Sequence, residues 1–275
     1  MSATPPTGKL EMTVARRGDT SIATRQRHTG ALRVLRPHYP DSPRQAHYTI
    51  INPGGGYLEG DTYEIHTRVN PGAHLELRTQ SATKVYRCTK LPATQQVQLH
   101  IDSHAVLSYI PEQLIMYTAA KYVQNTFLEV EPGGAGLIAE IITPGWDPAG
   151  ADFQFDELQI NTEIRVAGSL LAIDRLYLAP AQMEITALGV FEGYSHLGQL
   201  LLVLPHLSAQ DYAAFSSAVE AMAQVKAGTS FQGNLDGNQT VCVIVRSLAH
   251  DTAAIQLLHE YVHAWFLEHI PSANS

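Results

Sequence analysis

One stretch of the sequence has the spacing of a zinc-dependent hydrolase. His259, Glu260 and His263 match the pattern H-E-x-x-H, which on a helix places two imidazoles one turn apart beside a glutamate able to activate water. Catalytic zinc also needs a third protein ligand. Glu268 and His269 lie too close on the same helix to supply it, and the sequence ends at residue 275. We therefore interpret the motif as one flank of an amphipathic helix, with a zinc metallopeptidase as the alternative.

A glycine-rich segment has the spacing of a nucleotide-binding loop but the wrong charges. Gly55, Gly60 and Asp61 follow the phosphate-loop pattern, except that a carboxylate stands where the loop needs a lysine. Glu59 likewise replaces the last glycine of the dinucleotide pattern G-x-G-x-x-G. The residues of this segment therefore argue against a nucleotide-binding site. It predicts a turn between residues 51 and 63 that uses positive φ angles at glycine.

Three further features limit what the protein can bind and where it can be located. They are the two cysteines, the net charge and the first residues. Cys88 and Cys242 are far apart and form no C-x-x-C pair, so we expect two reduced, buried thiols. The net charge of -8 is opposite to what a phosphate-binding surface needs, so we expect no nucleic-acid partner. Residues 1–8 lack an apolar signal-peptide region, and no apolar run is long enough to cross a membrane. We expect a cytoplasmic protein that is not membrane-bound.

Short alternating segments dominate residues 9–178. Apolar and polar residues alternate there between interruptions by Gly, Pro, Asn and Asp, which is typical of strands and leaves no helix. A strand, a tight turn and another strand recur near residues 69–75, 101–107 and 130–135, with a period of roughly 30 residues. The recurrence fits stacked solenoid-like units or an ordinary β-sandwich. Both interpretations predict a large layered β structure with many turns.

Helical spacing appears only towards the end of the sequence. Ser208 opens an S-x-x-D cap, and apolar residues then recur every three or four positions until Gly228. Residues 238–247 have the pattern of a buried strand. Asp251 then caps a second amphipathic helix, which contains the H-E-x-x-H motif.

The composition fits a globular protein with a substantial core. The hydrophobic fraction of 45% and the charged fraction of 16% lie near globular averages, so no disorder is indicated. We predict a single domain over residues 1–275, with a β-rich body at 9–204 and a helix-strand-helix segment at 205–275.

One strand-like segment carries hydroxyl groups where an apolar face is expected. Between Leu75 and Val85 the middle of the alternating face consists of Thr79, Ser81 and Thr83. Hydroxyl groups that point into a sheet interior need hydrogen-bond partners or water. The face is therefore either an exposed Thr and Ser ladder or the lining of a hydrated internal passage.

Two longer motifs are specific. Residues 52–61 read N-P-G-G-G-Y-L-E-G-D, and residues 79–87 read T-Q-S-A-T-K-V-Y-R. In this order and at this distance the motifs closely resemble those of the urease accessory proteins UreD, also called UreH. The usual Pro-Arg-Ile-Trp-like ending of that family is absent at residues 269–272. Further matches lie at residues 30–37, 107–111, 140–146 and 174–176.

The resemblance implies both a fold and a function. The fold is mainly β, with β-helix-like layered sheets and a small C-terminal two-helix segment. The function is non-catalytic: a scaffold or chaperone that forms a complex with the accessory proteins UreF and UreG, docks onto apo-urease and helps incorporate nickel. No permanently bound cofactor is implied, only transient nickel.

A path for nickel would need a particular kind of lining. A complete ligand shell would trap an ion that stands high in the affinity series, so transfer needs sparse oxygen and nitrogen ligands in series. Glu64 and His66 lie on the same strand face and contribute a carboxylate and an imidazole. The predicted metal path consists of Asp61, Glu64, His66 and Glu140, with Thr79, Ser81, Thr83 and Lys84 as lining.

Overall fold

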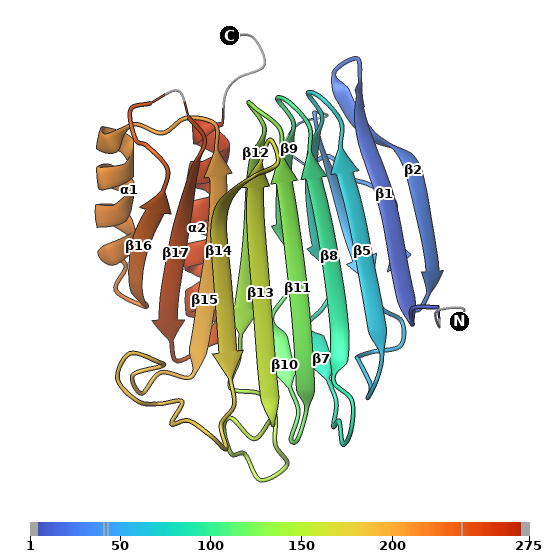
Figure 1. Ribbon diagram of the computed structural model, residues 1–275, viewed down its shortest axis with the longest axis vertical. Coiled ribbons are helices and arrows are strands. Elements are labelled where there is room, and N and C mark those ends of the chain that lie inside the picture. Colours follow the sequence, from blue (N-terminus) through green and yellow to red (C-terminus); the bar gives the residue numbers. More distant parts are fainter. Residues whose placement is uncertain (1–4, 41, 43, 238, 271–275) are drawn as a thin grey trace.

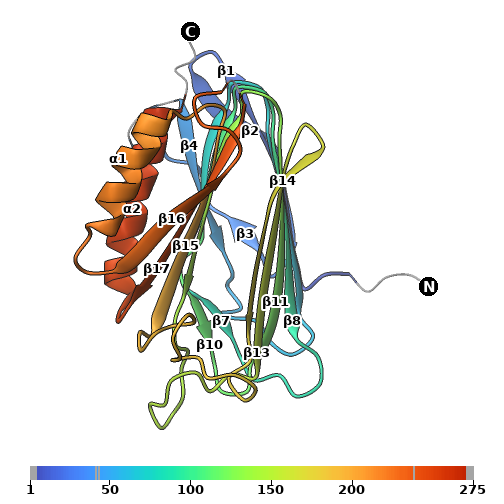
Figure 2. The same cartoon turned by 60° about the vertical axis from the view of Figure 1, so that its left-hand side comes forward.

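Two β-sheets packed face to face make up most of the molecule. The computed structural model describes residues 5–40, 42, 44–237 and 239–270. Figure 1 shows the seven-stranded sheet, here called sheet A, in front, and Figure 2 shows the two layers with both helices outside the second sheet, sheet B. Sheet A contains, in spatial order, β14 (Ser169–Leu178), β13 (Glu157–Val166), β11 (Lys121–Val130), β8 (Ala93–Ile101), β5 (Thr62–Val69), β1 (Gly8–Arg17) and β2 (Thr20–Gly30).

Sheet B has ten strands. Two of them, β7 (Thr83–Val85) and β10 (Leu114–Met116), pair with each other at its margin, and β10 also pairs with β12. The others are, in spatial order, β16 (Lys226–Gln232), β17 (Val241–Ala249), β15 (His196–Leu204), β12 (Ala135–Ile142), β9 (Val106–Ile110), β6 (His74–Thr79), β4 (Gln45–Ile51) and β3 (Arg33–Val34).

The predicted solenoid-like stacking is confirmed. The chain passes from sheet A to sheet B three times in succession, from β5 to β6, from β8 to β9 and from β11 to β12, at the three turns with the 30-residue period. Successive coils pair in parallel in both sheets. Two of these turns contain a glycine with positive φ, Gly72 at 68° and Gly133 at 80°, a conformation that favours glycine. The repeat therefore comes from turn chemistry and strand length together.

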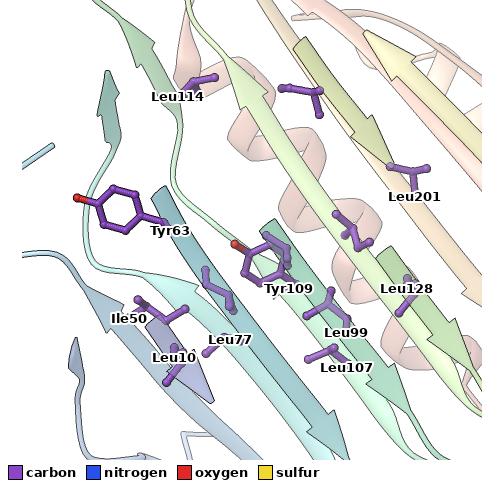
Figure 3. Close-up of a cluster of buried hydrophobic side chains, with 14 of the residues drawn as sticks. Leu10, Ile50, Tyr63, Leu77, Leu99, Leu107, Tyr109, Leu114, Leu128 and Leu201 are labelled. Atoms are coloured by element: carbon purple, nitrogen blue, oxygen red, sulfur yellow. The ribbon is translucent and has the colours of Figure 1, made fainter. Parts of the chain in front are cut away.

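The main core fills the space between the sheets. Leu10 and Leu99 of sheet A and Leu77 and Leu107 of sheet B belong to one buried cluster (Figure 3). The sheet A strands β1 and β8 alternate between buried and less buried positions, as β5 does along its length, because successive side chains point to opposite faces. The sheet B strands β6 and β9 are buried at most positions. Both cysteines are free and buried, as predicted.

The first helix is shorter than the sequence pattern predicts. α1 (Ala209–Glu220) starts at the predicted cap, where Ser208 Oγ accepts a hydrogen bond from the Asp211 backbone N–H. It ends at Glu220, so the prediction of a helix up to Gly228 was wrong. The residues from Lys226 onward form β16 instead, because they complete the edge of sheet B beside β17.

The second helix begins where predicted. α2 (Thr252–His269) is capped by Asp251, whose Oδ1 accepts from the Ala254 N–H over 2.8 Å. Its buried stripe, which includes Leu258 and Phe266, packs on β15, β12 and β17. Neither α1 nor any other helix in the described part of the chain combines the length and apolar character needed to cross a membrane.

Candidate functional site

A cavity lies between the two sheets beside the Thr- and Ser-rich segment. Its volume is about 70 Å³, which is large enough to hold ordered water. Apolar side chains such as Ile65 and Ile160 form part of the wall. The polar part of the wall consists of Asn52, Tyr57, Thr79, Gln80, Ser81, Thr83, Lys84, Gln95, Tyr109, Glu112, Tyr122, Gln124 and Glu140.

Four of the buried polar side chains form one hydrogen-bonded chain. Tyr57 Oη donates to Gln95 Oε1 over 2.5 Å, and Gln95 Nε2 donates to Gln124 Oε1 over 3.4 Å. Gln124 Nε2 then donates to Glu140 Oε1 over 2.5 Å. The glutamines come from β8 and β11 of sheet A and the glutamate from β12 of sheet B, so the chain of hydrogen bonds joins the two sheets.

Glu140 is the carboxyl group at the inner end of this chain. Its exposed fraction is 6%. Burial, and secondarily the nearby Asp174 carboxylate, raises the pKa of Glu140 to about 8, although the hydrogen bond from Gln124 lowers it in part. The carboxyl group is therefore mostly protonated at neutral pH. A cation that binds Glu140 must displace this proton, so its affinity should increase as the pH rises.

Polar side chains continue beyond Glu140 towards the β14 side of the molecule. Gln199 lies opposite Glu140 on β15, and its Nε2 donates to Asp174 Oδ1 over 3.0 Å. Asp174 pairs with Arg246, whose Nε donates to Gln199 Oε1 over 3.2 Å. Thr162 lies opposite Asp174, is 1% exposed, and its Oγ1 has no hydrogen-bond partner among the described residues. A buried polar line therefore crosses an otherwise apolar interior.

Five of the predicted site residues lie on the wall of the cavity. They are Glu140 and the four lining residues Thr79, Ser81, Thr83 and Lys84, which do not share one strand. β6 ends at Thr79 and β7 begins at Thr83, so the prediction of a single alternating strand face was wrong. Thr79 Oγ1 accepts from the Glu112 N–H over 2.8 Å and donates to the Ser81 carbonyl over 3.2 Å. The turn between the strands brings the side chains of Ser81 and Lys84 to the same cavity.

Asp61 has a structural position in the glycine-rich loop. Its carboxylate accepts from the Leu58 N–H over 2.8 Å and from Thr7 Oγ1 over 3.0 Å. The loop is a turn with Gly55 at φ 79° and Gly60 at φ 75°, as predicted. The contacts of Asp61 hold this loop, and the residue is not on the wall of the cavity.

Glu64 and His66 lie on the opposite side of sheet A from Glu140. The inner face of β5 carries the buried Tyr63 and Ile65, so their sequence neighbours face outward. Glu64 Oε2 lies 3.0 Å from Lys9 Nζ and 3.8 Å from His66 Nε2. The structure therefore does not bring the four predicted carboxyl and imidazole ligands together. It places Glu140 inside and the other three elsewhere.

Sequence reasoning missed several residues of the buried polar line. Gln95, Gln124, Gln199 and Asp174 were not predicted, and neither was their partner Arg246. A signal was present for three of them, because each has apolar residues two positions away on both sides: Gln95 lies between Ala93 and Val97, Gln199 between Leu197 and Leu201, and Asp174 between Ala172 and Leu176. Gln124 lies between Tyr122 and the polar Thr126, so its signal was weaker.

The line contains scattered ligands and no complete metal site. Across residues 5–40, 42, 44–237 and 239–270, no three His, Cys, Asp or Glu side chains are placed so that they could hold a metal ion together. The interior groups are single carboxyl, amide and hydroxyl oxygens, which bind divalent first-row metals more weakly than a full set of imidazoles and thiolates. The arrangement suits brief contact with an ion better than storage.

The H-E-x-x-H residues serve to pack α2 on sheet B. His259 is 6% exposed, and burial lowers its pKa to about 3, so the ring is neutral. His263 Nε2 lies 2.9 Å from Ser108 Oγ and 3.8 Å from Glu76 Oε2. Glu260 is exposed. The two imidazoles contact different parts of the sheet, as expected for an amphipathic helix and not for a zinc site.

Replacing Glu260 by glutamine is therefore expected to leave the protein unchanged. The exposed carboxylate would be the water-activating base of a peptidase, whereas in a packing helix its loss changes the free energy of unfolding by less than about 0.5 kcal/mol. Thermal unfolding of the variant and of the wild type, together with a peptide-hydrolysis assay of both, gives the answer. Peptide hydrolysis that the variant loses would support the peptidase alternative. Replacing both histidines is a poorer test, since both are largely buried.

Comparison with known proteins gives the same family from a family model and from individual relatives. The model of the family described as UreD urease accessory protein matches residues 6–273. The urease accessory protein UreD of Arthrobacter sp. (strain FB24) is 41% identical over 260 residues, which cover 92% of this chain and 87% of the relative. The protein of the same name from Actinomyces naeslundii is 44% identical over 70% of each chain. That of Bacillus cereus (strain ATCC 10987 / NRS 248) is 30% identical over 96% of this chain and 94% of the relative.

Proposed function

Because this chain belongs to the UreD family of urease accessory proteins, we propose that it promotes the incorporation of nickel into apo-urease without catalysing a reaction itself. It acts as a scaffold in the cytoplasm, in a complex with the accessory proteins UreF and UreG that docks onto urease. Its relatives are named accessory proteins, which supports a non-catalytic role. Nickel is the cargo of this process and not a resident cofactor.

The observation that carries the proposal is the buried polar line in the sheet interior. A folded protein rarely places Gln95, Gln124 and Glu140 side by side between two apolar sheet faces. The arrangement is unfavourable for stability, since each amide and carboxyl group loses its hydration and recovers only part of it through hydrogen bonds. A function that needs polar groups in the interior accounts for their presence.

The chemistry of the line fits the passage of a divalent cation. Thr79, Ser81 and Thr83 offer hydroxyl oxygens at one end, Gln124 offers an amide oxygen further in, and Glu140 offers the first buried carboxyl group. Each is a weak ligand on its own, so an ion moves from one to the next without being trapped. Loss of the Glu140 proton on binding supplies negative charge only while the ion is present.

Replacing Glu140 by alanine is expected to lower the nickel content of urease severalfold. The variant is co-expressed with UreF, UreG and the urease subunits, and nickel is measured in the purified urease by elemental analysis. The matched control is Glu64→Ala, which removes a carboxylate from the outer face of sheet A and leaves the cavity intact. Normal loading is expected with this control.

Two results would count against the proposal. Full nickel loading with Glu140→Ala, in a complex that still assembles, would show that the buried polar line takes no part in nickel transfer. Normal urease maturation in cells that lack the whole chain would show that the protein is not needed for maturation. The first result concerns the path and the second the function, so the two failures are distinguishable.

A further inference from the structure

We propose that the free edge of β14 receives an extended segment of a partner protein as an eighth strand of sheet A. The proposal goes beyond the nickel path, because it concerns how a partner attaches. β14 is the last strand of sheet A and pairs with β13 on one side. On its other side, no backbone hydrogen bond to another described residue occupies the edge.

Sheet B is wider than sheet A at this end. β17 and β16 continue sheet B beyond β15, and Figure 1 shows them extending past β14 without a strand of sheet A in front of them. The exposed part of β16 and β17 therefore forms a floor beside the β14 edge. Edge and floor together are called the β14 seat below.

The two edges of sheet A differ in chemistry. On β2, the opposite edge, the exposed side chains include Arg25 and Arg27, and charges on an edge strand prevent pairing with other chains. On β14, Leu170, Ile173 and Tyr177 are 51%, 48% and 47% exposed, and one charged side chain, that of Arg175, is exposed between them. A largely apolar edge strand is normally covered. The β14 edge is therefore less protected by charge than the β2 edge.

The floor of the β14 seat contains a groove. Gly228 lies opposite Arg246, and Ser230 lies opposite Ile244 in the pairing of β16 with β17. These four residues and Asp174 line a groove of about 420 Å³. A Cβ atom on Gly228 would meet no atom within 4 Å, although the residue does not have the positive φ that requires glycine. Glycine at this position therefore leaves open space above the sheet, and the backbone conformation does not require it.

The seat specifies the kind of segment that fits. In an added strand, alternate side chains point outward and inward. The outward ones lie beside the apolar Ile173 and Tyr177, with the exposed Arg175 between them. The inward ones lie over Ile244 and Gly228, with a carboxylate facing Arg246, whose side chain is 52% exposed. The expected occupant is a mainly apolar, extended segment with one acidic residue.

A second copy of this chain does not fit the seat. Two-fold pairing of β14 with its own copy would keep sheet B on the same side in both molecules. Each sheet B extends beyond β14 by β17 and β16, whereas paired strands lie only about 4.8 Å apart. The two floors would therefore occupy the same space. A single segment of a different protein avoids this overlap.

The test combines variants of the seat with hydrogen exchange. Ile173→Lys together with Tyr177→Lys adds charge to the exposed edge, and Gly228→Leu fills the floor. Both variants are expected to weaken binding to one of UreF, UreG or apo-urease about tenfold or more, a loss of roughly 1.4 kcal/mol. The control Leu188→Lys removes an apolar side chain that is 89% exposed elsewhere and should bind normally. The β14 amides of the full chain should exchange more slowly in that complex than in the free chain.

The outcomes separate the possibilities. Unchanged β14 exchange with all three partners, and wild-type binding by both variants, would overturn the proposal. Slower β14 exchange that depends only on the concentration of the chain itself would also overturn it, in favour of a second copy. Normal nickel loading in a complex weakened only at the seat leaves the interior path unaffected, so the two proposals fail independently.

Discussion

Replacing Glu140 by glutamine is expected to make the fold more stable than the wild type at alkaline pH. The pKa of Glu140 is about 8 in the folded protein and about 4.5 in the unfolded chain. Below pH 4.5 the carboxyl group is neutral in both states, so the two proteins should have similar stability. Between pH 4.5 and 8 the unfolded chain ionises while the folded one keeps the proton, so the wild type loses stability as the pH rises.

The loss should reach a few kcal/mol by about pH 8 and then remain constant, because one pKa unit corresponds to roughly 1.4 kcal/mol. Glutamine has the same shape, keeps the hydrogen bond from Gln124 and does not ionise. Urea unfolding of both proteins at pH 5, 7 and 9 measures the difference. A difference that does not change with pH would show that Glu140 is hydrated in the folded state.

Replacing Gly198 by alanine is expected to loosen α2 from sheet B. The new Cβ would lie 2.4 Å from Ile255 Cγ2 and 2.6 Å from Ser247 Oγ. Both distances are shorter than real Cβ contacts, so the helix or the strand must shift. Overpacking of this kind lowers the free energy of unfolding by about 1–3 kcal/mol, and more where the backbone cannot move.

The matched control is Gly228→Ala on β16. A Cβ at this position meets nothing within 4 Å, and the backbone does not need glycine. Alanine should therefore leave the stability unchanged or increase it slightly, since it restricts the unfolded chain. Thermal unfolding of the two variants side by side decides the matter. Equal melting temperatures would mean that α2 does not pack on Gly198 as described.

Much of the fold could be predicted because local chemistry dictates it. Alternation identified the strands between residues 9 and 178, and the three turns at 69–75, 101–107 and 130–135 gave the solenoid-like repeat. The caps at Ser208 and Asp251 located the starts of both helices. The strand β16 was missed, because the side chains that it turns towards α1 are those of Ala227, Thr229 and Phe231, which carry only a weak apolar alternation.

The candidate site was less predictable. The prediction of lining residues was correct for Thr79, Ser81 and Thr83. Their hydroxyl groups stand where an apolar face is expected, and all three line the cavity. Glu64 and His66 were grouped with Glu140, although their apolar neighbours Tyr63 and Ile65 already indicated that they face outward. Whether a nickel ion uses the interior residues stays a prediction.

What the sequence determined by itself was the set of strands, the turns between them and the family, since these depend on residues close together in the chain. Only the tertiary structure decided which polar side chains meet. Glu140, Gln199 and Arg246 are far apart in the sequence, yet they lie in register on neighbouring strands of sheet B. Pairing register and the facing of two sheets depend on long-range packing, which no local pattern specifies.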